Sequence, residues 1–285
     1  MLKALDRNIA TASDRIVFVA PSTAAVSEET FHNVDVDAGR HQRLVRDVQR
    51  MRGSIYVKDG ALQPHQLTTD GRHQTPEDET SWHMLLLDKQ QRVTACALYL
   101  EHDYHEVTFD QLRARHCPLT NEPEWRPTVE SAIESELDRA RSEQLHYVEL
   151  GGWAVSEDSR GTAGPLALAL AVYGFSRRAG GALGITTATF RHCSATILKR
   201  LGGARFEVNG VTLPPYFDSR YQCMMEMLKF DSRQPNPKYV SLIDQVRDTL
   251  ARITVVARPA TTMTESPYHL FTPRLPAFER RALAS

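Results

Sequence analysis

The sequence predicts an α/β (α+β) fold, in which strands and helices alternate along the chain. Two stretches carry this prediction. Residues 81–87 and 92–100 are apolar runs on either side of the polar residues 88–91, a pattern typical of an antiparallel β-hairpin. Residues 147–203 read in order as a strand, a glycine-bearing loop, an apolar helix, a second strand and a second helix. Together the two stretches indicate a sheet with helices packed on it.

The segments before the hairpin are less regular. Residues 38–52 predict a helix, because apolar side chains recur at helical spacing and arginines occupy the opposite face. Residues 55–57 are a short apolar run, for which we expect a strand. Residues 58–80 are polar and long for a connection, and loops of that length are usually functional or mobile.

After the hairpin, a helix is expected to begin at Pro127, since proline suits the first turn and the charges run from acidic to basic along the segment. In the next stretch the strand covers residues 147–155 and the loop residues 159–164. Pro165 then opens a helix that is apolar nearly all round and should be buried. The second strand covers residues 184–189, and the second helix lies within residues 191–203.

The last third of the chain predicts one more strand and one more helix. Residues 222–230 predict the strand and residues 240–253 an amphipathic helix. Beyond Arg258 the chain is rich in Pro and Thr without a period, which indicates a surface strap or a loosely ordered tail.

Composition excludes several classes of function. A net charge of -1 over 285 residues gives no overall attraction to nucleic acid, so we expect no nucleic-acid partner. No run approaches the roughly 18 apolar residues of a membrane span, and we expect a cytoplasmic protein without integral membrane contact. The histidines do not fall at metal-ligand spacing, and no metal site is expected. Zinc-ribbon or disulfide spacing is also absent from the four cysteines, which are Cys96, Cys117, Cys193 and Cys223.

The order of elements, the bulge-like Gly151-Gly152 and the loop from Arg160 to Gly164 resemble the GNAT acyltransferases. The resemblance implies a mixed, mostly antiparallel sheet flanked by helices. It also implies that the loop binds the pyrophosphate of coenzyme A or the phosphopantetheine of an acyl carrier protein. No tightly bound cofactor is expected beyond this acyl-phosphopantetheine donor. The residues expected to bind the donor are Gly151, Gly152, Trp153, Val155, Arg160, Gly161, Gly164, Arg191 and Ser194.

Within that superfamily, residues 45–232 are most similar to the autoinducer-synthase-like branch, which contains acyl-homoserine-lactone synthases and long-chain N-acyl amino acid synthases. The matching positions are Arg52 with Tyr56, Asp70 and Asp78-Glu79 ahead of Trp82, and Val148-Glu149-Leu150. The resemblance implies a GNAT-like domain over residues 37–232. An N-terminal extension would cover residues 1–36, and a C-terminal helix with an extended tail residues 233–285.

Two departures separate the groups of that branch. Lactone synthases follow their strand glutamate with Ser-Arg-Phe, where this chain has Gly151-Gly152-Trp153, and they carry an arginine where this chain has Leu98. The first expectation is therefore an N-acyltransferase that joins a medium or long acyl chain to an amino acid or related amine. An acyl carrier protein is the expected partner. The alternatives are a lactone synthase and a non-catalytic scaffold that binds an acyl carrier.

The chemistry of acyl transfer assigns roles to these positions. Glu149 is the first candidate for the base that takes the amine proton, with Asp70, Asp78 and Glu79 as alternatives. An ion pair that holds the sheet edge is the other interpretation of Glu149. Backbone N–H groups at Gly151-Gly152 would hold the oxyanion.

The amine substrate is expected to contact three residues. Arg52 would bind its carboxylate, and Tyr56 and Trp82 would complete its site. The tyrosine that many GNAT enzymes use to protonate the leaving thiol is replaced by Leu198. Because a thiol has a pKa near ~8.5, the thiolate can leave without an acid.

Overall fold

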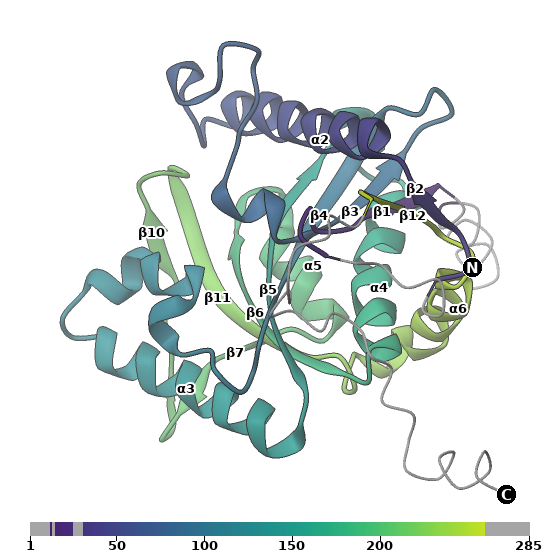
Figure 1. The fold of residues 1–285 in the computed structure, drawn as a ribbon. Coiled ribbons are helices and arrows are strands. Elements are labelled where there is room, and N and C mark those ends of the chain that lie inside the picture. The colour runs from purple at the N-terminus through teal and green to yellow at the C-terminus, as the bar shows by residue number, and fades with distance from the viewer. Residues whose placement is uncertain (1–11, 13–14, 25–30, 260–285) are drawn as a thin grey trace, which may run out of the picture.

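The computed structural model describes residues 12, 15–24 and 31–259. A ten-stranded sheet runs through the molecule (Figure 1). Along the sheet the strands are β10 (Tyr216–Asp218), β11 (Cys223–Asp231), β6 (Ala182–Thr189), β5 (His146–Val155), β4 (Val93–His102), β3 (Trp82–Leu87), β1 (Ile16–Val19), β12 (Thr254–Ala257) and β2 (Val34–Val36). In addition, β7 (Ala204–Arg205) pairs with β11, and β8 (Glu207–Val208) with β9 (Val211–Thr212) forms a separate small sheet.

The sheet is mixed and mostly antiparallel. Among the described strands, β5 with β6, β1 with β12 and β12 with β2 are parallel. The other neighbours in the large sheet are antiparallel, including the expected hairpin of β3 and β4. The predicted fold class is therefore confirmed.

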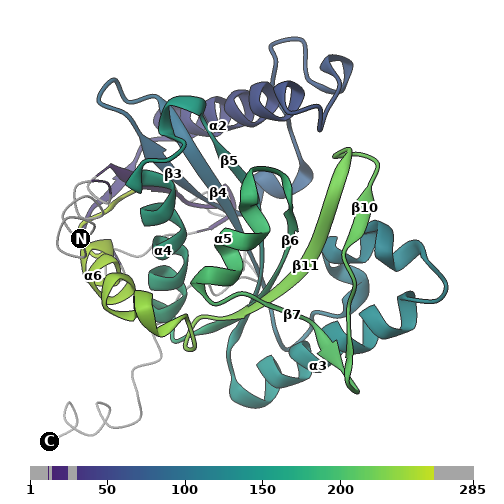
Figure 2. The ribbon, with the colours of Figure 1, turned by 180° about the vertical axis from the view of Figure 1, so that it is seen from behind.

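Helices cover both faces of the sheet (Figures 1 and 2). On one face lie α2 (Ala38–Lys58) and α3 (Arg126–Glu143). On the other lie α4 (Ala163–Arg178), α5 (Ser194–Leu201) and α6 (Val240–Leu250). The alternation along β4 shows the division, because Ala97 and Tyr99 join the core under α4 while Cys96 joins the core under α2.

Short 3-10 helices make up much of the connecting chain. They are η1 (Pro64–Gln66), η2 (Pro76–Glu79), η3 (Phe109–Gln111), η4 (Arg113–His116), η5 (Pro118–Asn121), η6 (Glu157–Ser159), η7 (Arg191–Cys193) and η8 (Pro237–Tyr239). None of the helices in the described part of the chain is long and apolar enough to cross a membrane.

The buried helix expected after the glycine loop is α4. It begins at Ala163, with Thr162 as its cap, and lies between the sheet and α6. Phe175 of this helix packs edge-on against Phe18, Trp82 and Tyr99 at centroid distances of 5.1–5.2 Å. This all-round burial explains why the segment is apolar on every face.

The strand expected over residues 55–57 is wrong, because these residues form the last turn of α2. Ile55 and Tyr56 are partly buried against the core under α2, so the helix gains burial by continuing past residue 52. Packing of this kind overrides the β preference of a short β-branched run. The other helix boundaries lie within a few residues of their expected positions.

Both ends of the described chain contribute to the large sheet. β1 and β2 come from residues 15–36, and β12 comes from residues 254–257. β1 pairs with β3 on one side and with β12 on the other. The domain boundaries expected at residues 37 and 232 thus fall within one continuous sheet. The expected tail beyond Arg258 lies outside the described residues except for Pro259.

Candidate active site

β5 and β6 separate in the middle of the sheet. Their pairing ends at Leu150 opposite Thr186, although β5 continues to Val155 and β6 to Thr189. β5 stays paired with β4 on its other side, and β6 with β11. Within the described sheet, the edge of β5 that faces β6 therefore has no strand partner from Gly151 onward. Its backbone N–H and C=O groups can pair with an extended ligand.

A β-bulge lies at the same point of β5. The pairing with β4 is irregular between Cys96 and Leu98, so Gly152 and Trp153 stand together opposite Ala97. Gly152 has φ +58°, and a Cβ atom there would lie 3.0 Å from the Cβ of Leu98. Because a side chain would meet both backbone strain and a close neighbour, this position requires glycine.

Two guanidinium groups lie against the glycines of the bulge. A Cβ atom on Gly152 would lie 3.3 Å from Nη1 of Arg52, which comes from α2. A Cβ atom on Gly151 would lie 3.1 Å from Nη1 of Arg113, which comes from η4. The missing side chains thus let two cations approach the backbone of β5, where an anion formed during a reaction would be stabilised.

The cation Arg52 is paired inside the protein. Its Nη2 lies 2.6 Å from Oδ1 of Asp78 and 3.1 Å from the carbonyl oxygen of His73. Asp78 also accepts hydrogen bonds from the side chain of Gln49 and the N–H of Thr75, both at 3.0 Å. Burial alone would raise the pKa of Asp78, but the charge of Arg52 and the bonds from Arg52 and Thr75 hold it below its usual value. Asp78 therefore stays ionised, as a partner of Arg52 and a weak base.

Aromatic side chains surround the backbone of β5 beside the bulge. The hydroxyl of Tyr56 donates to the carbonyl oxygen of Trp153 at 3.3 Å. The ring of Tyr56 lies edge-on to His73 and to Tyr221, at centroid distances of 5.5 and 6.3 Å. Burial and the charge of Arg52 lower the pKa of His73, so its imidazole is neutral at pH 7. The structure thus places Tyr56 beside the bulge and adds a neutral histidine.

Glu149 is buried and its carboxylate is fully engaged. Oε1 accepts from the N–H of Arg113 at 2.9 Å and lies 2.9 Å from Nε2 of His102. Oε2 accepts from the N–H of Ala114 at 2.9 Å. These bonds anchor the start of η4 on β5 and hold Arg113 beside Gly151. Of the two interpretations of Glu149, the geometry favours the one in which it fixes the structure at the sheet.

Three other expected site residues lie away from the bulge. The carboxylate of Asp70 bonds Arg72, Thr68 and Arg50, and the bonds from Arg72 do most to lower its pKa. Glu79 is exposed and lines a cavity under the first half of α2. Trp82 is buried in the core on the opposite face of the sheet, against α4. The structure therefore does not bring these three side chains to β5.

The glycine loop joins the end of β5 to α4. Gly161 has φ +77°, and the hydroxyl of Thr162 caps the helix by accepting from the N–H of Gly164 at 3.3 Å. Arg160 donates to the carbonyl oxygen of Val155 at 3.4 Å. The loop thus presents a cation and a helix N-terminus next to the unpaired edge of β5, and both features favour a bound anion.

Asp59, at the end of α2, contacts both loops beside this edge. Its Oδ2 lies 3.6 Å from Nη2 of Arg160 and 3.1 Å from Nε2 of His192. Its carbonyl oxygen accepts from Arg191, which also donates to the carbonyl oxygen of Gln222. Arg191 is therefore tied to backbone groups. Among the described residues, the carboxylate of Asp59 is the anion that Arg160 and His192 share.

The donor-site position Ser194 begins α5. Its hydroxyl donates to the carbonyl oxygen of Arg191 at 3.3 Å, and it does not cap the helix. The described residues contain no group of three or more His, Cys, Asp or Glu side chains arranged to hold a metal ion.

The sequence did not indicate Arg113, His73, His102 or Asp59. Arg113 follows a stretch of short turns without a period, and no motif marks it. The one signal was indirect: two adjacent glycines in a strand indicate a close approach by another group, but the sequence does not say which group.

No family model matches this chain, and no curated protein matches it. Several solved structures are similar to it. One is the CoA-dependent acyl-homoserine lactone synthase BjaI with SAM and isopentyl-CoA, with 16% identity, 87% of this chain and 95% of that chain covered, and a TM-score of 0.49.

Two further structures illustrate the range of the similarity. The CoA-dependent acyl-homoserine lactone synthase MesI has 13% identity, covers 82% and 95% of the two chains, and has a TM-score of 0.45. FeeM, an N-acyl amino acid synthase from uncultured soil microbes, has 12% identity, covers 74% and 94%, and has a TM-score of 0.43. Two of these three structures are thus acyl-homoserine lactone synthases and one is an N-acyl amino acid synthase, which are the two groups that the sequence patterns indicated.

Proposed function

We propose that this protein is an N-acyltransferase that moves an acyl chain from a phosphopantetheine thioester to the amine of an amino acid or a related small molecule. One observation carries the proposal: β5 leaves β6 at a glycine bulge against which the guanidinium groups of Arg52 and Arg113 lie. An unpaired strand edge suits an extended amide-bearing arm, and the two cations suit a developing oxyanion.

In this proposal the donor lies along the unpaired edge of β5. Its pantetheine amides would pair with the backbone beyond Gly151, which brings the thioester to the bulge. Its phosphate would meet Arg160 and the N-terminus of α4. Coenzyme A and an acyl carrier protein present the same arm, so this edge serves either donor.

An acyl carrier protein would need a basic surface in addition. The candidate patch consists of four basic residues at the C-terminal ends of α4 and α5, which are Arg177, Arg178, Lys199 and Arg200. Arg177 pairs with Asp244 at 2.8 Å and Lys199 pairs with Glu226. Arg200 is exposed. The patch is therefore partly neutralised within the chain, and a comparison of the two donors is part of the test below.

Acyl transfer then proceeds by addition and elimination. The neutral amine attacks the thioester carbonyl, a C–N bond forms, and the oxyanion is held by the N–H groups of the bulge with Arg113 nearby. The C–S bond breaks and the thiolate leaves, since a thiol of pKa near ~8.5 is an adequate leaving group. The amine proton passes to a neutral acceptor, for which His73 is the best placed side chain, directly or through water.

Arg113 is the better candidate to bind the acceptor's carboxylate. Its side chain is 36% exposed, and the ion pair described for it is with Glu77 at 3.6 Å. Arg52 is buried and already paired with Asp78. Arg113 therefore supplies, from a different segment, a cation near the position where Leu98 lacks one. For this reason lactone synthesis remains the second candidate function.

Measurement of thiol release from purified protein tests the proposal. Acyl-CoA and acyl carrier protein donors of several chain lengths are each combined with single amino acids or S-adenosylmethionine, and mass spectrometry identifies the product. An N-acyl amino acid supports the first candidate, and an acyl lactone supports the second. No thiol release with any pair, from protein that remains folded, would overturn both and leave a non-catalytic acyl-carrier scaffold.

A further inference from the structure

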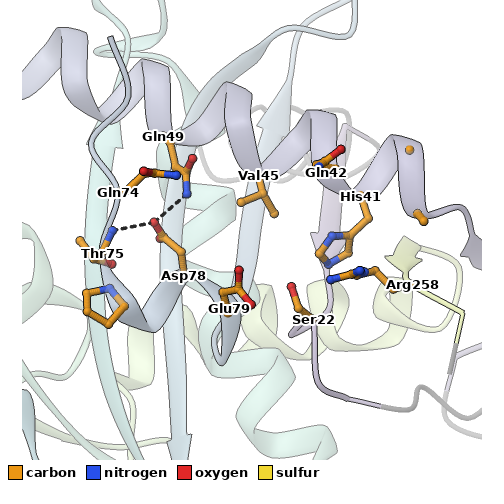
Figure 3. Close-up of a pocket in the computed structure, with 13 residues that line it drawn as sticks. Ser22, His41, Gln42, Val45, Gln49, Gln74, Thr75, Asp78, Glu79 and Arg258 are labelled. Carbon is orange, nitrogen blue, oxygen red and sulfur yellow. Dashed lines mark hydrogen bonds between the residues drawn. The ribbon is translucent and has the colours of Figure 1, made fainter. Parts of the chain in front are cut away.

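A polar cavity of about 620 Å³ lies under the first half of α2, apart from the bulge. Its roof is formed by α2, and its floor by residues 74–76, Asp78, Glu79, Ser22 and Arg258 (Figure 3). The side chains in it include amides, hydroxyls and charges of both signs, with Val45 the largest apolar one. A volume of this size suits a small metabolite, and the polar lining disfavours an acyl chain.

The cavity holds one cation and one anion for which the described residues supply no salt-bridge partner. Among the described residues, neither the guanidinium of Arg258 nor the carboxylate of Glu79 forms a salt bridge, and both residues are exposed. They enter from different segments, Arg258 after β12 and Glu79 at the end of η2. Figure 3 shows Arg258 beneath His41 and Glu79 nearer to Asp78.

The polar groups beside these charges are fixed in place. His41 is buried, and its Nε2 lies 2.7 Å from the carbonyl oxygen of Ala20. Because that oxygen only accepts, Nε2 carries the proton. Burial lowers the pKa of the imidazole, so it is neutral at pH 7. At the other end, Gln49 is held by its bond to Asp78. The cavity is therefore preformed.

The ion pair of Asp78 and Arg52 separates this cavity from the bulge. Asp78 lines the cavity, whereas Nη1 of Arg52 lies against Gly152 on β5. The carboxylate of Asp78 is already saturated by Arg52, Gln49 and Thr75, which leaves Glu79 as the carboxylate that a ligand can meet. The cavity is thus a second site, one ion pair away from the first.

We propose that this cavity binds a small zwitterion of the α-amino acid class, with its carboxylate on Arg258 and its ammonium on Glu79. A nucleotide fits less well, because Glu79 and Asp78 would repel its phosphates. A dicarboxylate without an amine would leave Glu79 unpaired. The site goes beyond the proposed acyl transfer, and its existence does not depend on that reaction.

Calorimetric titration of the full chain with three probes tests each contact. The probes are glutamine, glutamine α-amide, which lacks the α-carboxylate, and N-acetylglutamine, which lacks the ammonium. The unaltered protein is expected to bind glutamine at least about tenfold more tightly than either blocked probe, since a lost charge pair costs roughly 1.4 kcal/mol or more.

Substitution of each of the two exposed charged residues then shows which charge of the ligand that residue binds. In Arg258→Gln, glutamine and its α-amide are expected to bind equally, because the carboxylate no longer has a partner. In Glu79→Gln, glutamine and N-acetylglutamine are expected to bind equally. Arg247→Gln replaces a partly exposed arginine on α6, outside the cavity lining; it is the control and should keep all the preferences of the unaltered protein.

The site is overturned if no probe binds at millimolar concentration, or if both substitutions keep the preferences of the unaltered protein. Since the probes are titrated without an acyl donor, a failure here is distinct from a failure of thiol release. A panel of other amino acids, titrated in the same way, would define the side-chain preference.

Discussion

Arg52 and Asp78 form an ion pair with both side chains only 2% exposed, 2.6 Å apart, and this pair joins α2 to η2 directly behind the bulge. Asp78→Asn would leave a buried guanidinium without its counter-charge. We expect a loss of about 3–5 kcal/mol in the free energy of unfolding, measured by urea denaturation. Asp70→Asn is the control, because Asp70 also pairs with an arginine but is 41% exposed. Equal losses of unfolding free energy in Asp78→Asn and Asp70→Asn would contradict a stabilising role for the buried ion pair.

Gly152→Ala should impair acyl transfer far more than its effect on stability implies. The new Cβ atom would lie 3.0 Å from Leu98 and 3.3 Å from Arg52, which displaces the guanidinium from β5. We expect at least a tenfold lower rate of thiol release. Gly60→Ala is matched to it, since Gly60 has φ +72° but no atom near its missing Cβ. Gly60→Ala should carry a strain of about 1–2 kcal/mol and keep its activity.

Asp59→Asn should strengthen donor binding. Asp59 now shares its carboxylate between Arg160 and His192, and a donor phosphate would compete with it for both. Removing a pair worth up to about 1 kcal/mol corresponds to roughly a fivefold lower dissociation constant for coenzyme A. Calorimetry with coenzyme A measures the change. Arg160→Gln should shift the constant in the opposite direction, and a weaker complex with Asp59→Asn would exclude competition.

Glu149→Gln should act through Arg113. The amide would direct an N–H group at one of the two backbone donors of η4, so Arg113 would lose its place beside Gly151. We expect kcat/KM to fall at least tenfold, with a rise in KM for the acceptor. Arg113→Gln should show the same rise in KM, whereas a direct base would lower kcat alone. The two variants together separate positioning from proton transfer.

Stability should fall as the pH drops from about 6.5 to 4. Burial lowers the pKa of His83 from 6.5 to about 4, so in this window the unfolded chain binds a proton that the folded protein does not. Each such group lowers the unfolding free energy by up to about 1.4 kcal/mol per pH unit. His83→Gln should reduce the slope, measured by urea unfolding at pH 7, 6 and 5. The lowered pKa values of His41 and His73 make stability fall with pH in the same direction. The His83→Gln protein should therefore keep a smaller dependence of its unfolding free energy on pH.

Local sequence patterns predicted the central part of the fold. The hairpin of β3 and β4 was predictable because two apolar runs flank a polar turn, and α4 because its segment is apolar all round. β1, β2 and β12 were not, since each has three or four residues and is stabilised by partners far away in the sequence. No local signal reports such pairing.

The residues of the candidate site also fall into those that local sequence could predict and those that it could not. Gly152 and Arg160 could be recognised because their conformation or charge belongs to a local motif. Arg113 could not, because its place at Gly151 depends on two hydrogen bonds to a carboxylate in another segment. Trp82 matched the sequence pattern, but the direction of its side chain is set by the alternation of β3 and places it in the core.

β1 lies between β3 and β12, and its residues come from near the opposite end of the described chain from those of β12. While the ribosome makes this protein, β1 can pair with the hairpin on one side only, and its other edge stays open until residues 254–257 emerge. Open apolar edges pair readily with other chains. A nascent chain stalled before β12 should therefore depend on chaperones more than the chain that includes β12.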